Sequence, residues 1–142
     1  MTTKHKMSFF LLDDDFTFNF IHRKKIEKFG IDQEIVEFTS PTKAILYFMD
    51  ANEDQIPDIL LLDINMPELN GFEFLDALKA KEPDLCDKLN VFIVTSSLNP
   101  EDYQTAKGYD CIKGFHNKPI DLDNIMTTSS WLLNQKTKVK IK

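Results

Sequence analysis

The sequence has few of the features that mark secreted, membrane-spanning or nucleic-acid-binding proteins. It contains only two cysteines, Cys86 and Cys111, which are too few for a disulfide framework. No apolar run approaches the length of a membrane span, and the formal net charge of −6 argues against a surface that binds nucleic acid. What remains is an ordinary globular composition, with 42% hydrophobic and 28% charged residues.

The composition of the N-terminal segment is not the one expected of an export signal. Its short apolar stretch ends in three aspartates, and no small-residue cleavage site follows. We therefore expect a cytoplasmic protein with no membrane insertion. The length of 142 residues predicts one domain, residues 1–133, without an attached output domain. The alternating lysines of residues 134–142 predict a disordered, solvated basic tail, with a basic docking arm as the alternative.

Five short apolar runs predict five strands. They are Ser8–Leu12, Glu34–Phe38, Asp58–Leu62, Val91–Val94 and Cys111–Phe115. Three of these runs are continuously apolar, as expected for strands that are covered on both faces. Segments of helical length alternate with them: Thr17–Phe29, the segment from Pro41 capped by Ser40, Gly71–Ala80, Pro100–Lys107 and Asp121–Leu133. This alternation predicts an α/β fold, a doubly wound five-stranded parallel sheet with five helices on its two sides.

The first predicted helix has an apolar face. Phe18, Ile21, Ile26 and Phe29 fall on one side at about 100° per residue, whereas Phe20 lies outside it. We expect this side to pack on the sheet.

Polar residues follow four of the five predicted strands. Asp13, Asp14 and Asp15 follow the first strand, and Asp63 follows the third. The fourth strand runs into residues 95–97, Thr-Ser-Ser, and the fifth stops just before Lys118 and Pro119. Because a parallel sheet brings its carboxyl ends to one edge, we expect acids, a hydroxyl and an ammonium group in one crevice.

Such a crevice has a definite chemistry. Two carboxylates about 5 Å apart repel by on the order of 3 kcal/mol at an effective dielectric near 20, which favours raised pKa values or a bound cation. Oxygen ligands suit Mg²⁺, and the three histidines of the chain show no ligand spacing. A carboxylate nucleophile, a divalent cation, a hydroxyl and a lysine are together the groups needed for phosphoryl transfer to aspartate.

Four motifs, "LLDDD", "LLLDINMPELNG", "FIVTSS" and "NKP", resemble those of the receiver domain of two-component response regulators. The resemblance extends from about Phe9 to Leu133. It implies a flavodoxin-like (βα)5 fold with strand order 2-1-3-4-5. It also implies a stand-alone, single-domain response regulator that takes part in phosphorelay signal transduction.

The resemblance assigns the acidic residues. Asp63 would be the phospho-acceptor, taking a phosphoryl group from a phosphohistidine on a histidine kinase or histidine phosphotransfer protein. Asp14 would be the principal Mg²⁺ ligand, with Asp13 and Asp63 beside it and the backbone carbonyl of Asn65 completing the set. In the loop that follows, Gly71 would help turn this carbonyl toward the metal.

The resemblance also assigns the groups around the phosphoryl site. Thr95 would hydrogen-bond one phosphoryl oxygen, and Lys118 would pair with another. Thr95 and Phe115 would move together as a switch, although phenylalanine lacks the hydroxyl of the tyrosine that many relatives carry, and a static core role for Phe115 stays open. Ser96 flanks the site, and Pro119 is a candidate for a cis peptide bond.

Signalling would pass through the surface of the fourth and fifth helices and the fifth strand to an unidentified protein target. A phosphorylation-dependent homodimer is a further option. The protein would not be an enzyme, apart from Mg²⁺-dependent phosphorylation of itself from a donor and its own dephosphorylation.

Two alternatives compete with this interpretation. "DDDFT" also resembles a motif of haloacid-dehalogenase-like phosphatases, with Asp13 as nucleophile and Asp15 as general acid. Those enzymes need a further acidic motif, but only 24 residues follow Lys118, and Asp63 would have no role. The other alternative is a degenerate receiver that acts only as a protein-binding module, which fits poorly with a complete set of site residues.

Overall fold

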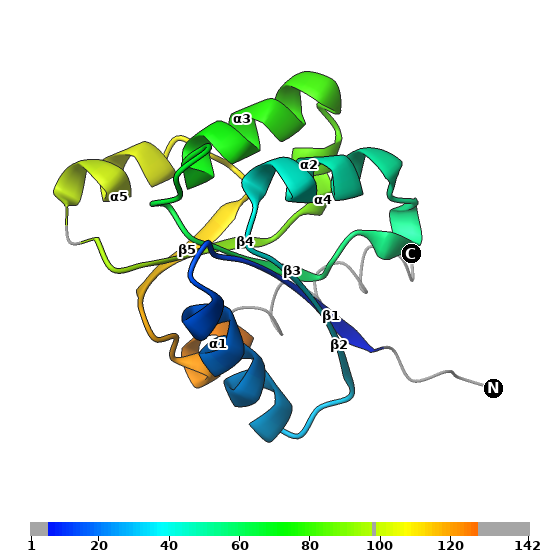
Figure 1. Ribbon diagram of the computed structural model, residues 1–142, viewed down its shortest axis with the longest axis vertical. Coiled ribbons are helices and arrows are strands. Elements are labelled where there is room, and N and C mark those ends of the chain that lie inside the picture. The colour runs from blue at the N-terminus through cyan, green and yellow to red at the C-terminus, as the bar shows by residue number, and fades with distance from the viewer. Residues whose placement is uncertain (1–5, 98, 128–142) are drawn as a thin grey trace.

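The computed structural model describes residues 6–97 and 99–127, apart from the side chain of Cys86. Its centre is a parallel sheet with strand order β2-β1-β3-β4-β5 (Figure 1). The strands are β1 (Met7–Leu12), β2 (Gln33–Phe38), β3 (Ile59–Leu62), β4 (Val91–Thr95) and β5 (Ile112–Asn117). The predicted doubly wound fold and the order 2-1-3-4-5 are confirmed.

Helices cover both faces of the sheet. They are α1 (Phe16–Lys28), α2 (Pro41–Asp50), the 3-10 turn η1 (Glu53–Gln55), α3 (Gly71–Lys81), α4 (Leu85–Lys88) and α5 (Pro100–Ala106). Residues 122–127 form a further helix. In Figure 1, α1 and this last helix lie on one face of the sheet, and α2, α3 and α5 lie on the other. The predicted helices agree with these bounds to within one or two residues over the described part of the chain.

Some predictions differ from the structure or fall outside it. The single turn α4 follows Pro83 and was not predicted, because four residues are too short to show an apolar period. Asp121 caps the last helix by accepting the backbone N–H of Asn124 at 3.3 Å. The remainder of that predicted helix, residues 128–133, and the predicted basic tail, residues 134–142, lie outside the described residues.

The hydrophobic core has two halves, one on each face of the sheet. Alternate residues of the central strands supply them: Leu60 and Leu62 of β3 enter one half, and Ile59 and Leu61 enter the other. All four are at most 3% exposed, which explains why β3 is apolar throughout. Full burial of each such side chain is worth about 1.5–3 kcal/mol.

The buried face of α1 differs from the predicted one. The structure buries Asn19, His22 and Ile26, which are spaced as one helical stripe, while Phe29 is 38% exposed. Phe18 and Ile21 are half-buried. The prediction is confirmed at Ile26, which is 0% exposed, and is wrong at Phe29. It missed Asn19 and His22 because it counted only apolar residues, whereas a buried Asn or His depends on hydrogen-bond partners elsewhere in the chain.

The register of the sheet brings the strand ends together. Leu12 pairs with Leu62, and Thr95 pairs with Asn117, so the segments that follow all emerge at the same edge. The start of α3 is held there by Gly71, whose N–H donates to the carbonyl of Ile64 at 2.8 Å. A Cβ atom at position 71 would lie 2.6 Å from the backbone oxygen of Asp63. Only glycine therefore allows α3 to begin this close to the aspartate.

Candidate functional site

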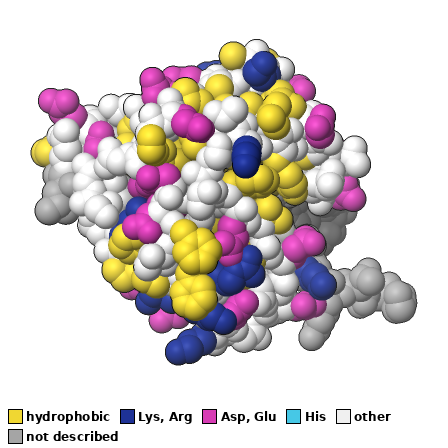
Figure 2. Space-filling view, in the orientation of Figure 1, with side chains coloured by type: hydrophobic (Ala, Val, Ile, Leu, Met, Phe, Trp, Pro, Cys, Tyr) yellow, Lys and Arg dark blue, Asp and Glu magenta, His cyan; other side chains and the backbone are white. Residues whose placement is uncertain are grey.

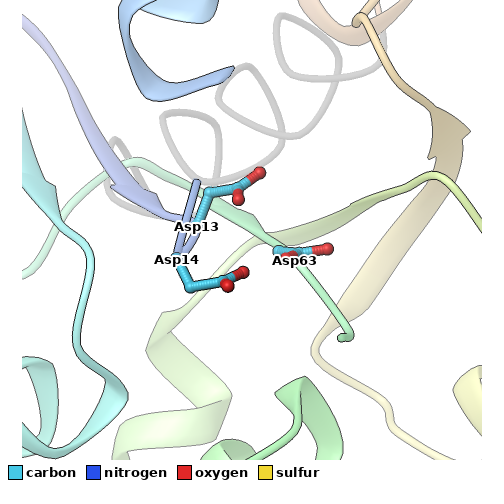
Figure 3. Close-up of side chains that lie close together, drawn as sticks. All are labelled: Asp13, Asp14 and Asp63. Atoms are coloured by element: carbon cyan, nitrogen blue, oxygen red, sulfur yellow. The ribbon is translucent and has the colours of Figure 1, made fainter. Parts of the chain in front are cut away.

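Three carboxylates meet at the carboxyl edge of the sheet. Asp13 and Asp14 follow β1, Asp63 follows β3, and one oxygen from each lies within 4.8 Å of the others (Figure 3). Asp13 and Asp63 are only 4% and 3% exposed, whereas Asp14 is open to solvent. The site thus has two buried acids and one acid at its mouth.

Lys118 bridges the two buried acids. Its Nζ lies 2.6 Å from Oδ2 of Asp13 and 3.4 Å from Oδ1 of Asp63, with a side chain that is only 6% exposed. Its backbone N–H donates to the carbonyl of Thr95 at 3.0 Å, and the peptide bond between Lys118 and Pro119 is cis. The lysine is therefore fixed at its backbone and at its charged end.

The pKa of Asp63 reflects this crowding. Burial and the neighbouring Asp13 carboxylate raise the pKa of Asp63 to about 7, while Lys118 acts in the opposite direction. Burial also raises the pKa of Asp13, and hydrogen bonds from Lys118 and from the N–H of Asp15 oppose it. One ammonium group thus offsets only part of the cost of two buried carboxyl groups.

The donor set suits a hard divalent cation. All three side chains offer carboxylate oxygens, and the open Asp14 would let a cation keep several of its waters, as Mg²⁺ prefers. A cation here would also relieve the repulsion that raises the pKa of Asp63. Asn65 lies two residues beyond Asp63 in the loop before α3, and the use of its backbone carbonyl as a ligand remains a prediction.

Thr95 ends β4 beside the lysine. It is completely buried, and its Oγ1 accepts the N–H of Ser97 at 3.0 Å. That bond uses a lone pair of the hydroxyl oxygen and leaves its hydrogen for another acceptor. Ser96, one residue later, is exposed. Thr95 is therefore equipped to donate a hydrogen bond close to Lys118.

Phe115 links the sheet to α5. It is half-buried on β5, and its ring meets that of Tyr103 edge-on, with centroids 5.5 Å apart. Tyr103 is 48% exposed, and Nζ of Lys107 lies 5.0 Å from its ring centroid. The predicted switch residue thus contacts an exposed aromatic side chain that the sequence alone did not single out.

Three further residues near the site were missed by the sequence analysis. Phe18, Asn19 and His22, all on α1, contact the chain around Asp13 and Lys118. The first of them, Phe18, lies five residues after Asp13, and the spacing of the three residues places them on one side of the helix. No sequence signal separates them from ordinary helix residues, because their partners lie up to 98 residues away.

The parallel sheet with this strand order and an acid cluster opposite a buried lysine define a receiver-type site. A family model described as response regulator receiver domain matches residues 9–129. The chain belongs to that family. Receiver domains of this family function in phosphorelay signalling and bind Mg²⁺ in an acidic pocket.

Individual relatives agree with this assignment. The transcriptional regulatory protein FlgR of Helicobacter pylori is 31% identical over 137 residues, covering 92% of this chain and 32% of FlgR. The regulatory protein LuxO of Vibrio vulnificus is 24% identical over 130 residues, covering 92% of this chain and 26% of LuxO. A two-component response regulator from Cytophaga hutchinsonii superposes with a TM-score of 0.83 at 30% identity, covering 92% of this chain and 99% of that one.

The family assignment covers the receiver domain and not the full length of the relatives. The chain spans only about a quarter to a third of the length of these two curated relatives. The phosphatase alternative finds no support, since the family is that of receivers and Asp15 is the N-cap of α1, accepting the N–H of Thr17 at 2.9 Å. None of the helices in the described parts of the chain combines the length and apolar character needed to cross a membrane.

Proposed function

We propose that Asp63 accepts a phosphoryl group from a phosphohistidine of a histidine kinase or histidine phosphotransfer protein. The observation that carries the proposal is the position of Lys118, whose ammonium group contacts both Asp13 and Asp63 in a buried site. A lysine held there can neutralise an anion attached to Asp63 without first moving into the site. Burial strengthens that attraction, because few waters screen it.

The transfer is a displacement at phosphorus. An Asp63 carboxylate oxygen attacks, a phosphorus–oxygen bond forms, and the bond between phosphorus and the imidazole nitrogen breaks. The freed imidazole nitrogen takes up a proton. Lys118 and the Thr95 hydroxyl each stabilise a phosphoryl oxygen. Mg²⁺, held by Asp13, Asp14, Asp63 and the Asn65 carbonyl, would supply further positive charge when bound.

The same site would remove the phosphoryl group by hydrolysis. Attack of water on the acyl phosphate returns Asp63 and releases inorganic phosphate. Ser96 follows Thr95 and Asn65 lies two residues after Asp63, and both are exposed, so their side chains would influence how long the phosphorylated state lasts. The protein then catalyses only reactions of its own carboxyl group.

Incubation with Mg²⁺ and acetyl phosphate tests the acceptor. We expect the intact mass to rise by one phosphoryl group, and Asp63→Ala to abolish this gain. Asp50→Asn, at an exposed carboxyl group on α2, is the control and should be labelled normally. A full mass gain in Asp63→Ala would overturn the assignment. No gain in the wild-type protein would instead support the degenerate, binding-only receiver.

A protein donor would dock over α1. Phe16 is 70% exposed and Phe20 is 49% exposed on this helix, which begins three residues after Asp13. Nζ of Lys24 lies 5.5 Å from the ring centroid of Phe20. Figure 2 shows hydrophobic, basic and acidic side chains together over α1. Ion pairs join Arg23 and Lys24 to Glu27 on this helix. Such a mixed aromatic and charged surface suits a partner with apolar and charged side chains around its phosphohistidine.

The phosphorylated protein would signal through α5, β5 and the helix that begins at residue 122. The contact between Phe115 and Tyr103 supports this, since it connects the strand that precedes Lys118 to an exposed side chain of α5. We further predict that the protein signals to a separate target protein, that residues 1–133 function as a single domain without an output domain, and that phosphorylation can cause homodimerisation. A cytoplasmic location is also predicted. Affinity capture with and without phosphorylation tests the target, sedimentation tests the dimer, and cell fractionation tests the location.

A further inference from the structure

The phosphoryl-site lysine is held by α1, a helix that supplies none of the predicted acceptor or metal ligands. Two residues of that helix make the relevant contacts. His22 bonds to the backbone of Ile120, two residues after the lysine, and Phe18 contacts the ammonium group of the lysine itself. Phe18 and His22 are four residues apart, so they lie on the same side of the helix, and their rings are 5.9 Å apart.

His22 fixes the backbone after the lysine. Its side chain is buried, with the residue 2% exposed, and its Nε2 accepts the N–H of Ile120 at 3.3 Å. Pro119 has no N–H, so the amide of Ile120 is the first donor after that of Lys118. The amide of Lys118 donates to Thr95. Every amide from Lys118 to Ile120 that can donate is therefore bonded, and the lysine Cα is fixed between two anchors.

The histidine is in the state that this role needs. Burial, together with the charges of Lys118 and Lys25, lowers the pKa of His22 to about 4. The imidazole is thus neutral near pH 7. With Nε2 accepting, its proton is on Nδ1. Because the bond joins residues 98 positions apart in the chain, it cannot be a product of local helix geometry.

Phe18 limits where the lysine side chain can go. Its ring centroid lies 4.4 Å from Nζ of Lys118, while the carboxylates of Asp13 and Asp63 contact the same ammonium group. The ring offers a cation–π contact in a place with little water, where such contacts are strongest. Phe18 therefore closes the side of the ammonium group that faces α1 and leaves it directed at the acids.

We propose that His22 and Phe18 are positioning residues for Lys118, which hold its backbone and its ammonium group where an anion on Asp63 will need them. The proposal rests on the proposed function of Asp63. It adds that the rate at which Asp63 is phosphorylated depends in part on these two side chains of α1, although neither touches the phosphoryl group.

Two substitutions of His22 separate hydrogen bonding from packing. His22→Gln keeps a side-chain acceptor, and His22→Met fills similar space without a good one. We expect His22→Met to slow phosphorylation by acetyl phosphate about tenfold, within the range that small misplacements of a catalytic group produce. We expect His22→Gln to restore most of the rate. His116→Met, at a half-buried histidine of β5, is the matched control and should leave the rate unchanged.

A double substitution tests whether His22 acts through the lysine. In a Lys118→Ala background, His22→Met should slow phosphorylation no further, because the group that it positions is gone. A purely structural role would slow the reaction equally in both backgrounds. All rates are measured at a temperature where thermal denaturation shows each variant to be folded. Phe18→Leu and Phe18→Tyr provide a second pair of variants, since only tyrosine keeps an aromatic ring beside the ammonium group. We expect phosphorylation to slow in Phe18→Leu and not in Phe18→Tyr.

The outcomes are distinct. If the wild-type protein takes up no phosphoryl group on Asp63, the proposed function itself fails. If the wild-type protein is labelled, and folded His22→Met and Phe18→Leu are labelled at the wild-type rate, the positioning role is wrong while the acceptor assignment stands. Equal losses for His22→Met and His22→Gln would also contradict it, since the hydrogen-bond acceptor would then not matter.

Discussion

Asp63 should destabilise the folded protein at neutral and alkaline pH when no cation is bound. Its pKa is about 7 in the folded protein, against an ordinary value of 3.8. The folded state therefore holds this proton more tightly than the unfolded state does. The stability that the proton provides is complete below about pH 4 and is lost as the pH rises through about 7.

The size of the effect follows from the two pKa values. The difference between about 7 and 3.8 corresponds to on the order of 4 kcal/mol at pH 8. Asp63→Asn keeps the shape of the side chain and removes its charge. We therefore expect it to increase the free energy of unfolding by a few kcal/mol at pH 8 in EDTA, and by almost nothing at pH 4. Such a gain is large beside a typical total stability of about 5–15 kcal/mol.

Urea unfolding from pH 4 to pH 8 measures this difference directly. Asp50→Asn, at an exposed carboxyl group, should follow the wild-type protein at every pH. Mg²⁺ at about 100 times its dissociation constant should stabilise the wild-type protein by about 2.7 kcal/mol and should stabilise Asp63→Asn less. The difference in unfolding free energy between the two proteins at pH 8 should therefore become smaller. If wild type and Asp63→Asn lose stability in parallel across this pH range, the reasoning about the buried acids is refuted.

Two further predictions concern the loop and the docking surface. Gly71→Ala should cost about 1–3 kcal/mol of stability and slow phosphorylation, because its Cβ would lie 2.6 Å from the Asp63 carbonyl. Gly108→Ala, where the nearest atom is at 3.4 Å, should cost much less in the same urea experiment. Replacing Phe16 and Phe20 together by alanine should slow transfer from a phosphohistidine protein at least tenfold and leave labelling by acetyl phosphate unchanged. An equal loss with both donors would show that these side chains serve the site and not docking.

Local patterns were enough to predict the architecture. The apolar run of β3 predicts a strand buried on both faces, and the structure buries all four of its residues. Ser40 and Pro41 predict a helix start, and Ser40 accepts the N–H of Lys43 at that point. These features follow from backbone geometry and side-chain polarity within a few residues. The order 2-1-3-4-5 came from the resemblance, since strand runs alone do not say which strands are neighbours.

The finer arrangement of the site could not be predicted in the same way. The motifs indicated that Lys118 would oppose the acids, but not that its ammonium group lies closer to Asp13 than to Asp63. Helical periodicity placed Phe18 and Phe29 on the buried side of α1, whereas the structure buries Asn19 and His22. A polar side chain is buried where it finds partners, and those partners belong to other strands and loops.

By itself, then, the sequence determined the kind of fold, the chemical groups at the sheet edge and the reaction they suit. Each of these depends on residue type and on spacing along a strand or helix. The tertiary structure alone decided the pKa of Asp63, the pairing of Lys118 and the contact from His22 to Ile120. Those properties depend on distances of a few ångströms between segments far apart in the chain, and burial amplifies them because it removes the water that would screen them.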